Sequence, residues 1–227
     1  EISTVGVMEF VYEQSDAAPY LKIMIDENLF PLLKAQVDGK ELIIGPKKIK
    51  ENSRNGNSYN LQPTKFKVIT NSREIKELNV VSSGDFIIAS PINIGKLEIN
   101  MAGSGNILLE KKVEGNKLEI NLASSGSVVA SNIDLAGIEC SLAGSGYIQI
   151  AGKADRAEYN LAASGNIKAY ECVTGKTECN IAGSGNIQTH TRNQLEANIV
   201  GSGNVYYKGN PTTSKSIIGS GKLKSAN

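Results

Sequence analysis

Apolar and polar residues alternate along most of the chain, as in "LEINM" at 97–101 and "AEYNL" at 157–161. This period of two is typical of a strand that buries one face and exposes the other. The first 75 residues contain similar stretches, namely "TVGVMEFVY", "YLKIMID", "ELIIG" and "FKVIT". The pattern therefore predicts an all-β protein. One short apolar stretch, "ENLFPLLKAQV", instead predicts a helical turn with Asn28 as its cap and Pro31 in its first turn.

A four-residue motif with glycine in its third position interrupts the alternation eight times. The copies begin at positions 82, 103, 124, 144, 163, 183, 201 and 219, so the spacing is 18 to 21 residues. A repeat near twenty residues predicts a solenoid. A phosphate-binding loop would need a following Gly-Lys-Ser/Thr, or a third glycine and a helix start, and no copy has either. We interpret the motif as a turn in which glycine adopts positive φ. The predicted turn glycines are Gly84, Gly105, Gly126, Gly146, Gly165, Gly185, Gly203 and Gly221.

Two columns of the aligned repeats are apolar throughout. They lie two residues before and four residues after the start of each motif, as in Met101 and Ile107. Stacked on one another, they would form a continuous core that no single repeat buries alone. We therefore expect a parallel β-solenoid of about eight rungs centred on Gly-Ser-Gly turns. Residues 76–227 would form the repeats, and residues 1–75 a β-rich capping region continuous with them in a single domain.

Outward columns carry the polar chemistry. A glutamate column lies five residues before the first seven motifs. A basic column lies two residues earlier in four of the copies, and an amide column of asparagines lies two residues later in six. Stacked carboxylates repel one another, so we expect a ladder of ion pairs with the basic column. A cation site is the alternative that we considered, since carboxylate oxygens suit Ca²⁺. The glutamates are Glu77, Glu98, Glu119, Glu139, Glu158, Glu178 and Glu196.

A third outward column changes character along the chain. It starts with Ile87, Leu108 and Val129 and becomes polar later, where it includes Tyr206. Three apolar residues on consecutive rungs would form an exposed patch, which in soluble proteins usually marks an interface. We expect the N-terminal segment to cover them, with a second protein chain, and hence a homo-oligomer, as the alternative. These four residues are the candidate interface.

The composition limits the classes of function that the protein could have. The 227 residues carry a net charge of +1, which does not indicate a nucleic-acid partner, and no apolar run is long enough to span a membrane. The three cysteines have no metal-type spacing, and we interpret them as buried free thiols. The single histidine, His190, lies in a polar run, and the six aspartates share no repeat column. We therefore expect no catalytic residue, cofactor or metal site. Asp134 and Asp155, at similar offsets in adjacent repeats, are the carboxylates to test if the protein were an enzyme.

The repeated "GSGNI", preceded by "LEINMA" or "ECNIA" and by "LKIMIDENLFPLLKAQVDGKELII" near the start, resembles a known family. This is the auto-transporter adhesin "head GIN" domain family of Bacteroidetes and related bacteria, and the resemblance spans about residues 4–225. It implies a right-handed β-helix-like solenoid, export from the cell, often as a lipoprotein, and a role in adhesion. It implies no catalytic or ligand-binding residues.

These observations favour a non-catalytic, exported binding module that adheres to a glycan or a protein at the cell surface. We expect it in the periplasm, anchored to the outer membrane or outside the cell; the first residue, Glu1, fits a processed chain. A structural spacer in a surface assembly is the first alternative. A polysaccharide-active enzyme is the second, because parallel β-helices host such enzymes.

Overall fold

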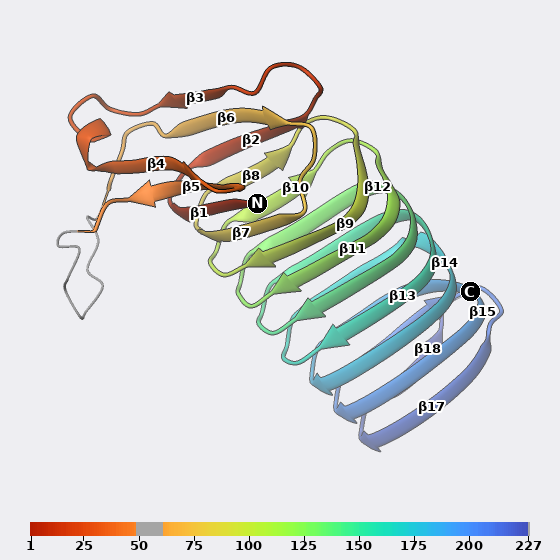
Figure 1. The fold of residues 1–227 in the computed structure, drawn as a ribbon. Coiled ribbons are helices and arrows are strands. Elements are labelled where there is room, and N and C mark those ends of the chain that lie inside the picture. The colour runs from red at the N-terminus through yellow and green to blue at the C-terminus, as the bar shows by residue number, and fades with distance from the viewer. Residues whose placement is uncertain (49–60, 227) are drawn as a thin grey trace.

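The structure is a computed structural model that describes residues 1–48 and 61–226. Strands make up 70% of the chain and helix 1%, and the strands wind into a β-solenoid of about seven turns (Figure 1). The eight motif copies delimit these turns. The predicted all-β, β-helix-like solenoid is thus confirmed.

Eighteen strands are described. Those before the first motif are β1 (Ile2–Gly6), β2 (Glu9–Gln14), β3 (Leu21–Met24), β4 (Leu33–Asp38), β5 (Glu41–Pro46), β6 (Lys67–Ser72) and β7 (Glu77–Ser82). The remainder are β8 (Asp85–Ile88), β9 (Ile92–Met101), β10 (Asn106–Leu109), β11 (Val113–Leu122), β12 (Ser127–Leu142), β13 (Tyr147–Leu161), β14 (Asn166–Gly183), β15 (Asn186–Gly201), β16 (Asn204–Lys208), β17 (Thr212–Gly219) and β18 (Lys222–Ser225).

Each motif separates two walls of the solenoid. Face A comprises the strand segments before the motifs, from β7 through the end of β15 to β17; face B comprises the segments after them, from β8 to β18. On face A, β11 pairs in parallel with β9 and β12, so that Leu97, Leu118 and Ile138 stack in register. On face B, β10 pairs in parallel with β8 and β12. Corresponding residues of successive repeats therefore lie directly over one another.

The two predicted apolar columns form the core. Their members are buried from Val80 to Ile199 on face A and from Phe86 to Val205 on face B. The last members, Ile217 and Leu223, are half-buried because no described strand stacks beyond β17 and β18. The two columns thus form one continuous, mainly aliphatic core, as expected of a repeat protein.

The turn glycines lie where the sequence places them, but the reason for glycine differs from the predicted one. None of the eight has a positive φ. Instead, each lies against the turn of the preceding rung: a Cβ built on Gly105 would be 1.9 Å from the carbonyl oxygen of Gly84, and one on Gly146 would be 2.1 Å from that of Gly126. Positive φ occurs two residues earlier, at the first motif position, in some copies, as at Gly103, where φ is 147°. Glycine is needed because it has no Cβ, and backbone freedom is secondary.

The N-terminal strands are built into the same two walls. β1 pairs in parallel with β5 and β7 on face A, while β2 pairs in parallel with β6 and β8 on face B. At the outer end, β4 pairs antiparallel with β5 and β3 pairs antiparallel with β6. We propose that these antiparallel strands act as the cap expected for residues 1–75, since they end the parallel stacking.

The expected helical turn is a 3₁₀ helix, η1 (Phe30–Leu32), shorter than its apolar stretch indicates. Pro31 lies in its first turn as predicted, but Asn28 is not the cap. Leu29 takes the capping position without any side-chain hydrogen bond. The following residues, from Leu33, pair with β5 instead of extending the helix.

The three cysteines are free and fully buried, as expected. Cys140 and Cys179 lie on either side of Tyr159 in one inward column of face A. Burial raises the pKa of Cys172 to about 11 and that of Cys140 well above its usual range. The reactive thiolate form is therefore suppressed.

Gly146→Ala is expected to destabilise the protein by about 1–3 kcal/mol or more, because the new methyl group meets backbone that cannot move aside. Gly95→Ala is the matched control, since a Cβ there has no atom within 4 Å. Chemical denaturation of both variants tests this. Equal stabilities would contradict the proposed role of the glycine column.

A thiol-reactive reagent such as Ellman's reagent is expected to leave all three cysteines unmodified in native buffer and to modify all three in 6 M guanidinium. Rapid modification of even one thiol in the native protein would show that the core around Tyr159 is open to solvent.

Candidate functional site

Seven glutamates stack along the outside of face A. Glu77 pairs with Glu98, Glu98 with Glu119, and the register continues through Glu139 and Glu158 to Glu178 and Glu196. Neighbouring strands lie about 4.8 Å apart, so these carboxylates would repel one another without compensation. Two kinds of neighbour provide it.

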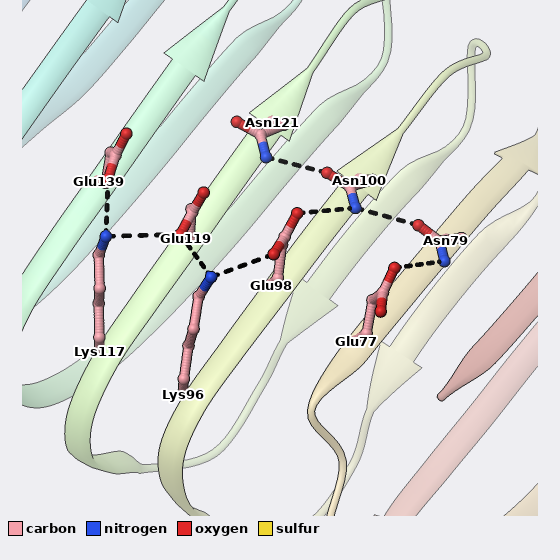
Figure 2. A network of polar contacts seen from close by, with 9 residues as sticks. All are labelled: Glu77, Asn79, Lys96, Glu98, Asn100, Lys117, Glu119, Asn121 and Glu139. Atoms are coloured by element: carbon pink, nitrogen blue, oxygen red, sulfur yellow. Dashed lines mark hydrogen bonds and ion pairs between the residues drawn. The ribbon is translucent and has the colours of Figure 1, made fainter. Parts of the chain in front are cut away.

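The first kind is the amide column beside the glutamates (Figure 2). Asn100 donates a hydrogen bond to the Oδ1 atom of Asn79 at 3.0 Å, and Asn121 donates to that of Asn100 at 2.9 Å. Asn100 also donates to Glu98 on its own strand at 3.2 Å. Asn100 thus donates both to an amide of the preceding rung and to a carboxylate, and the amides stack as in the amide ladders of cross-β structures.

The second kind is the basic column. The Nζ atom of Lys96 lies 3.1 Å from Glu98 and 3.0 Å from Glu119, and that of Lys117 lies 3.4 Å from Glu119 and 2.8 Å from Glu139 (Figure 2). Each lysine therefore bridges two rungs. The hydrogen bond from Lys96 is the main cause that lowers the pKa of Glu119. The predicted ion-pair ladder is present in this half of the face.

The pattern breaks at β12. Gly137 stands in the basic column between Lys117 and Arg156, and Ser141 stands in the amide column between Asn121 and Asn160. Gly137 has no side chain and that of Ser141 is short, so neither residue continues its ladder. The face is hollowed here into a groove of about 740 Å³ that extends across β11 to β15. Its lining includes Asn116, Lys117, Gly137, Glu139, Asp155, Arg156, Glu158, Lys176, Glu178, Gln194 and Glu196.

Beyond the break, the charged groups of the groove are not paired with one another. Within the described ranges, Arg156 and Lys176 have no carboxylate within 4.0 Å, whereas Lys96 and Lys117 each have two. Glu158 and Glu178 each accept a hydrogen bond from the asparagine two residues on, both at 3.0 Å. A guanidinium, an ammonium and several carboxylates are thus available to a ligand that enters the groove.

The candidate interface lies on face B and does not meet the groove. Leu108 pairs with Ile87 and Val129, and all three are half-buried. We expected the N-terminal segment to lie over these residues. Instead, strands β2 and β6 lie beside them in the same sheet and continue the column with Val11 and Ile69. The aliphatic column is therefore longer than the sequence indicates.

Tyr206 lies in the same column, four rungs beyond Val129, and is separated from it by polar residues. The Nζ atom of Lys224 lies 5.6 Å from the centre of its ring. Two similar pairs occur on β13 to β16: Lys168 lies 4.7 Å from the ring centre of Tyr147, and Lys208 lies 4.8 Å from that of Tyr170. Tyr207 packs against the core, as its register predicts.

The other residues singled out in the sequence are not brought together as an active site. Asp134 forms an ion pair with Lys153 at 3.1 Å, while Asp155 lies in the groove. His190 is half-buried rather than exposed, and its carbonyl oxygen accepts a hydrogen bond from Thr174. In the described part of the chain, no three His, Cys, Asp or Glu residues are arranged to hold a metal ion.

Comparison with protein families assigns the chain. Residues 1–114 and 107–211 match the family described as "Putative auto-transporter adhesin, head GIN domain". The chain belongs to this family. The repeated glycine turn that suggested the family is the feature on which the whole solenoid is built. A comparison with curated proteins found no match.

Crystal structures of similar proteins share the fold over the whole chain. A Parabacteroides distasonis protein named "putative lipid binding protein" is 52% identical, with a TM-score of 0.96; the match covers 100% of this chain and 92% of that one. A putative adhesin from Parabacteroides merdae is 34% identical, with a TM-score of 0.91 and coverage of 100% and 91%. Another from P. distasonis is 30% identical, with a TM-score of 0.90 and coverage of 99% and 91%.

Among the described residues of this head GIN protein, no helix has the length and apolar character required to cross a membrane.

Lys96→Met is expected to lower the free energy of unfolding at pH 7, and the loss should shrink as the pH falls below about 4.5. The reason is that the lowered pKa of Glu119 adds stability above its ordinary value of 4.5, which disappears as the carboxylate is protonated. Denaturation curves at several pH values measure this. Lys176→Met, in the same column but without a carboxylate partner, is the control. A pH-independent difference for Lys96→Met would contradict the ladder.

Proposed function

We propose that this head GIN protein is a non-catalytic binding module, exported to the cell surface, that adheres to a glycan through the groove on face A. The observation that carries the proposal is the groove across β11 to β15, where the ladder stops and, among the described residues, Arg156, Lys176 and Glu158 have no ion-pair partner. The family description as an adhesin supports binding at the cell surface and export.

A glycan fits the lining better than a protein does. The cores of protein interfaces are rich in aromatic and apolar residues and poor in charge. This groove has charged or amide side chains on every strand, with only small or aliphatic side chains such as Ala136, Ile138 and Ala157 between them. Sugar hydroxyls both donate and accept hydrogen bonds, so they suit carboxylates and cations placed side by side. An acidic sugar would add a bidentate contact with Arg156.

The rigidity of the face also suits this role. Successive strands hold the lining residues at fixed spacing, so little conformational freedom would be lost when a long polymer binds. A stiff spacer in a surface assembly needs the same fold but no groove. A change in the groove should therefore alter binding if the protein is an adhesin, and should have no such effect if it is a spacer.

Gly137→Trp is expected to lower the amount of protein retained on immobilised glycans at least tenfold, because the indole fills the groove. A Cβ at this position meets no atom within 4 Å, so the variant should fold. Gly95→Trp is the control, since Gly95 is equally unhindered and lies outside the groove.

The measurement is binding of the wild type and both variants to an array of glycans and matrix proteins, with the solution analysed for released sugar. Equal retention of all three would place the binding site elsewhere. Lack of retention by the wild type would favour the spacer. Released sugar would contradict the non-catalytic part of the proposal.

A further inference from the structure

The N-terminal end of the solenoid contains a second, chemically different cavity. Beyond the first complete rung, face A continues through β1, β5 and β4, and face B continues through β2, β6 and β3 (Figure 1). The inner sides of these two extensions line a cavity of about 380 Å³. This volume lies within the range of small-molecule sites.

The register shows that the cavity occupies the position of a further core layer. On face A, the inward column Leu78 and Ile2 continues outward to Leu42 and Val37. Ile2 is 5% exposed, but Val37, in the same column, is 70% exposed. The outermost strand thus presents an aliphatic side chain toward the core without a partner to cover it.

The opposite wall has the same gradient. The inward column of face B runs from Ile88 through Tyr12 and Thr70 to Leu21. Tyr12 is fully buried, whereas Leu21 is 39% exposed. Pro19 and Ile75 add further apolar surface to the lining. Two facing walls therefore present aliphatic groups to a shared space.

The buried polar side chains in this lining are already paired within the protein. Thr70 donates a hydrogen bond to the Tyr20 carbonyl oxygen at 2.6 Å, and the Asn71 Oδ1 atom accepts one from the Tyr20 amide at 2.9 Å. The Tyr12 hydroxyl lies 2.9 Å from the Ser72 hydroxyl. These bonds fix the loop before β3 against β6. They leave hydrocarbon as the surface that an occupant would contact.

We infer that this cavity binds the aliphatic chain of an amphipathic small molecule, with the polar head at the mouth. The cavity is too small for a helix, and the buried polar groups of its walls are already paired within the protein. Glu1, Lys40 and Glu74 also line it, so charges of both signs are present. The chain, rather than the charge of the head, therefore determines recognition.

The test measures binding of the uncharged fluorophore N-phenyl-1-naphthylamine to the whole chain. The emission of this fluorophore rises in apolar surroundings. We expect saturable enhancement that is displaced by dodecanoate and not by butanoate. The variant Leu21→Asn/Val37→Asn should bind the fluorophore at least fivefold more weakly. The control Val200→Asn/Ile218→Asn replaces two other exposed aliphatic residues, which pair on face A far from the cavity, and should bind as the wild type does.

Equal binding by both double variants, or no enhancement with the wild type, would overturn the inference. Light scattering provides a second readout: a dimer that dissociates only in Leu21→Asn/Val37→Asn would mean that a second copy covers the cavity, which also overturns it. Gly137→Trp should leave fluorophore binding unchanged, so the outcome is independent of the glycan proposal.

Discussion

The close approach of one turn to the next is the constraint on which the rest of the structure depends. The carbonyl oxygen of each turn glycine points at the place where the next turn glycine would carry a Cβ, only 2.2 Å away in the case of Gly105 and Gly126. Backbone amides in the turns complete the contact, as where Gly185 donates to the Ala163 carbonyl oxygen at 3.0 Å. A side chain at these positions would push neighbouring rungs apart.

Fixed stacking at the turns sets the register of both faces, and the register sets the surface chemistry. Because residues of the same kind fall on one another, glutamates necessarily stack with glutamates and asparagines with asparagines. Asparagine tolerates this, since its amide both donates and accepts. Glutamate does not, so lysines that bridge two rungs accompany it where the ladder is complete. The groove arises where Gly137 and Ser141 interrupt these columns.

Much of this arrangement could be predicted from the sequence because a solenoid converts spacing along the chain into position in space. The burial of Met101 and Ile107, the stacking of the glutamates and the family all follow from the repeat. The role of the turn glycines could not be predicted, since the contact that excludes a Cβ is made with another rung. The break at Gly137 was visible as a missing lysine, but the groove could not be predicted, because residues from five strands of the folded face line it.

The N-terminal region was the least predictable part for a related reason. Residues 1–75 lack the motif, so no alignment fixes their register. Strands β1 and β2 reach their places by pairing with β7 and β8, which lie more than 70 residues later. The resulting cavity is therefore a property of long-range pairing and has no sequence signal of its own.

Hydrogen exchange of the turn amides tests the central claim most directly, because it reports on the contacts between rungs. If the glycine turns hold the stack together, the amides of Gly165, Gly185 and Gly203 should be protected as strongly as those of the strands beside them. Exchange at these three amides as fast as in an exposed loop, with the strands still protected, would show that the strands alone hold the solenoid together and would contradict the account.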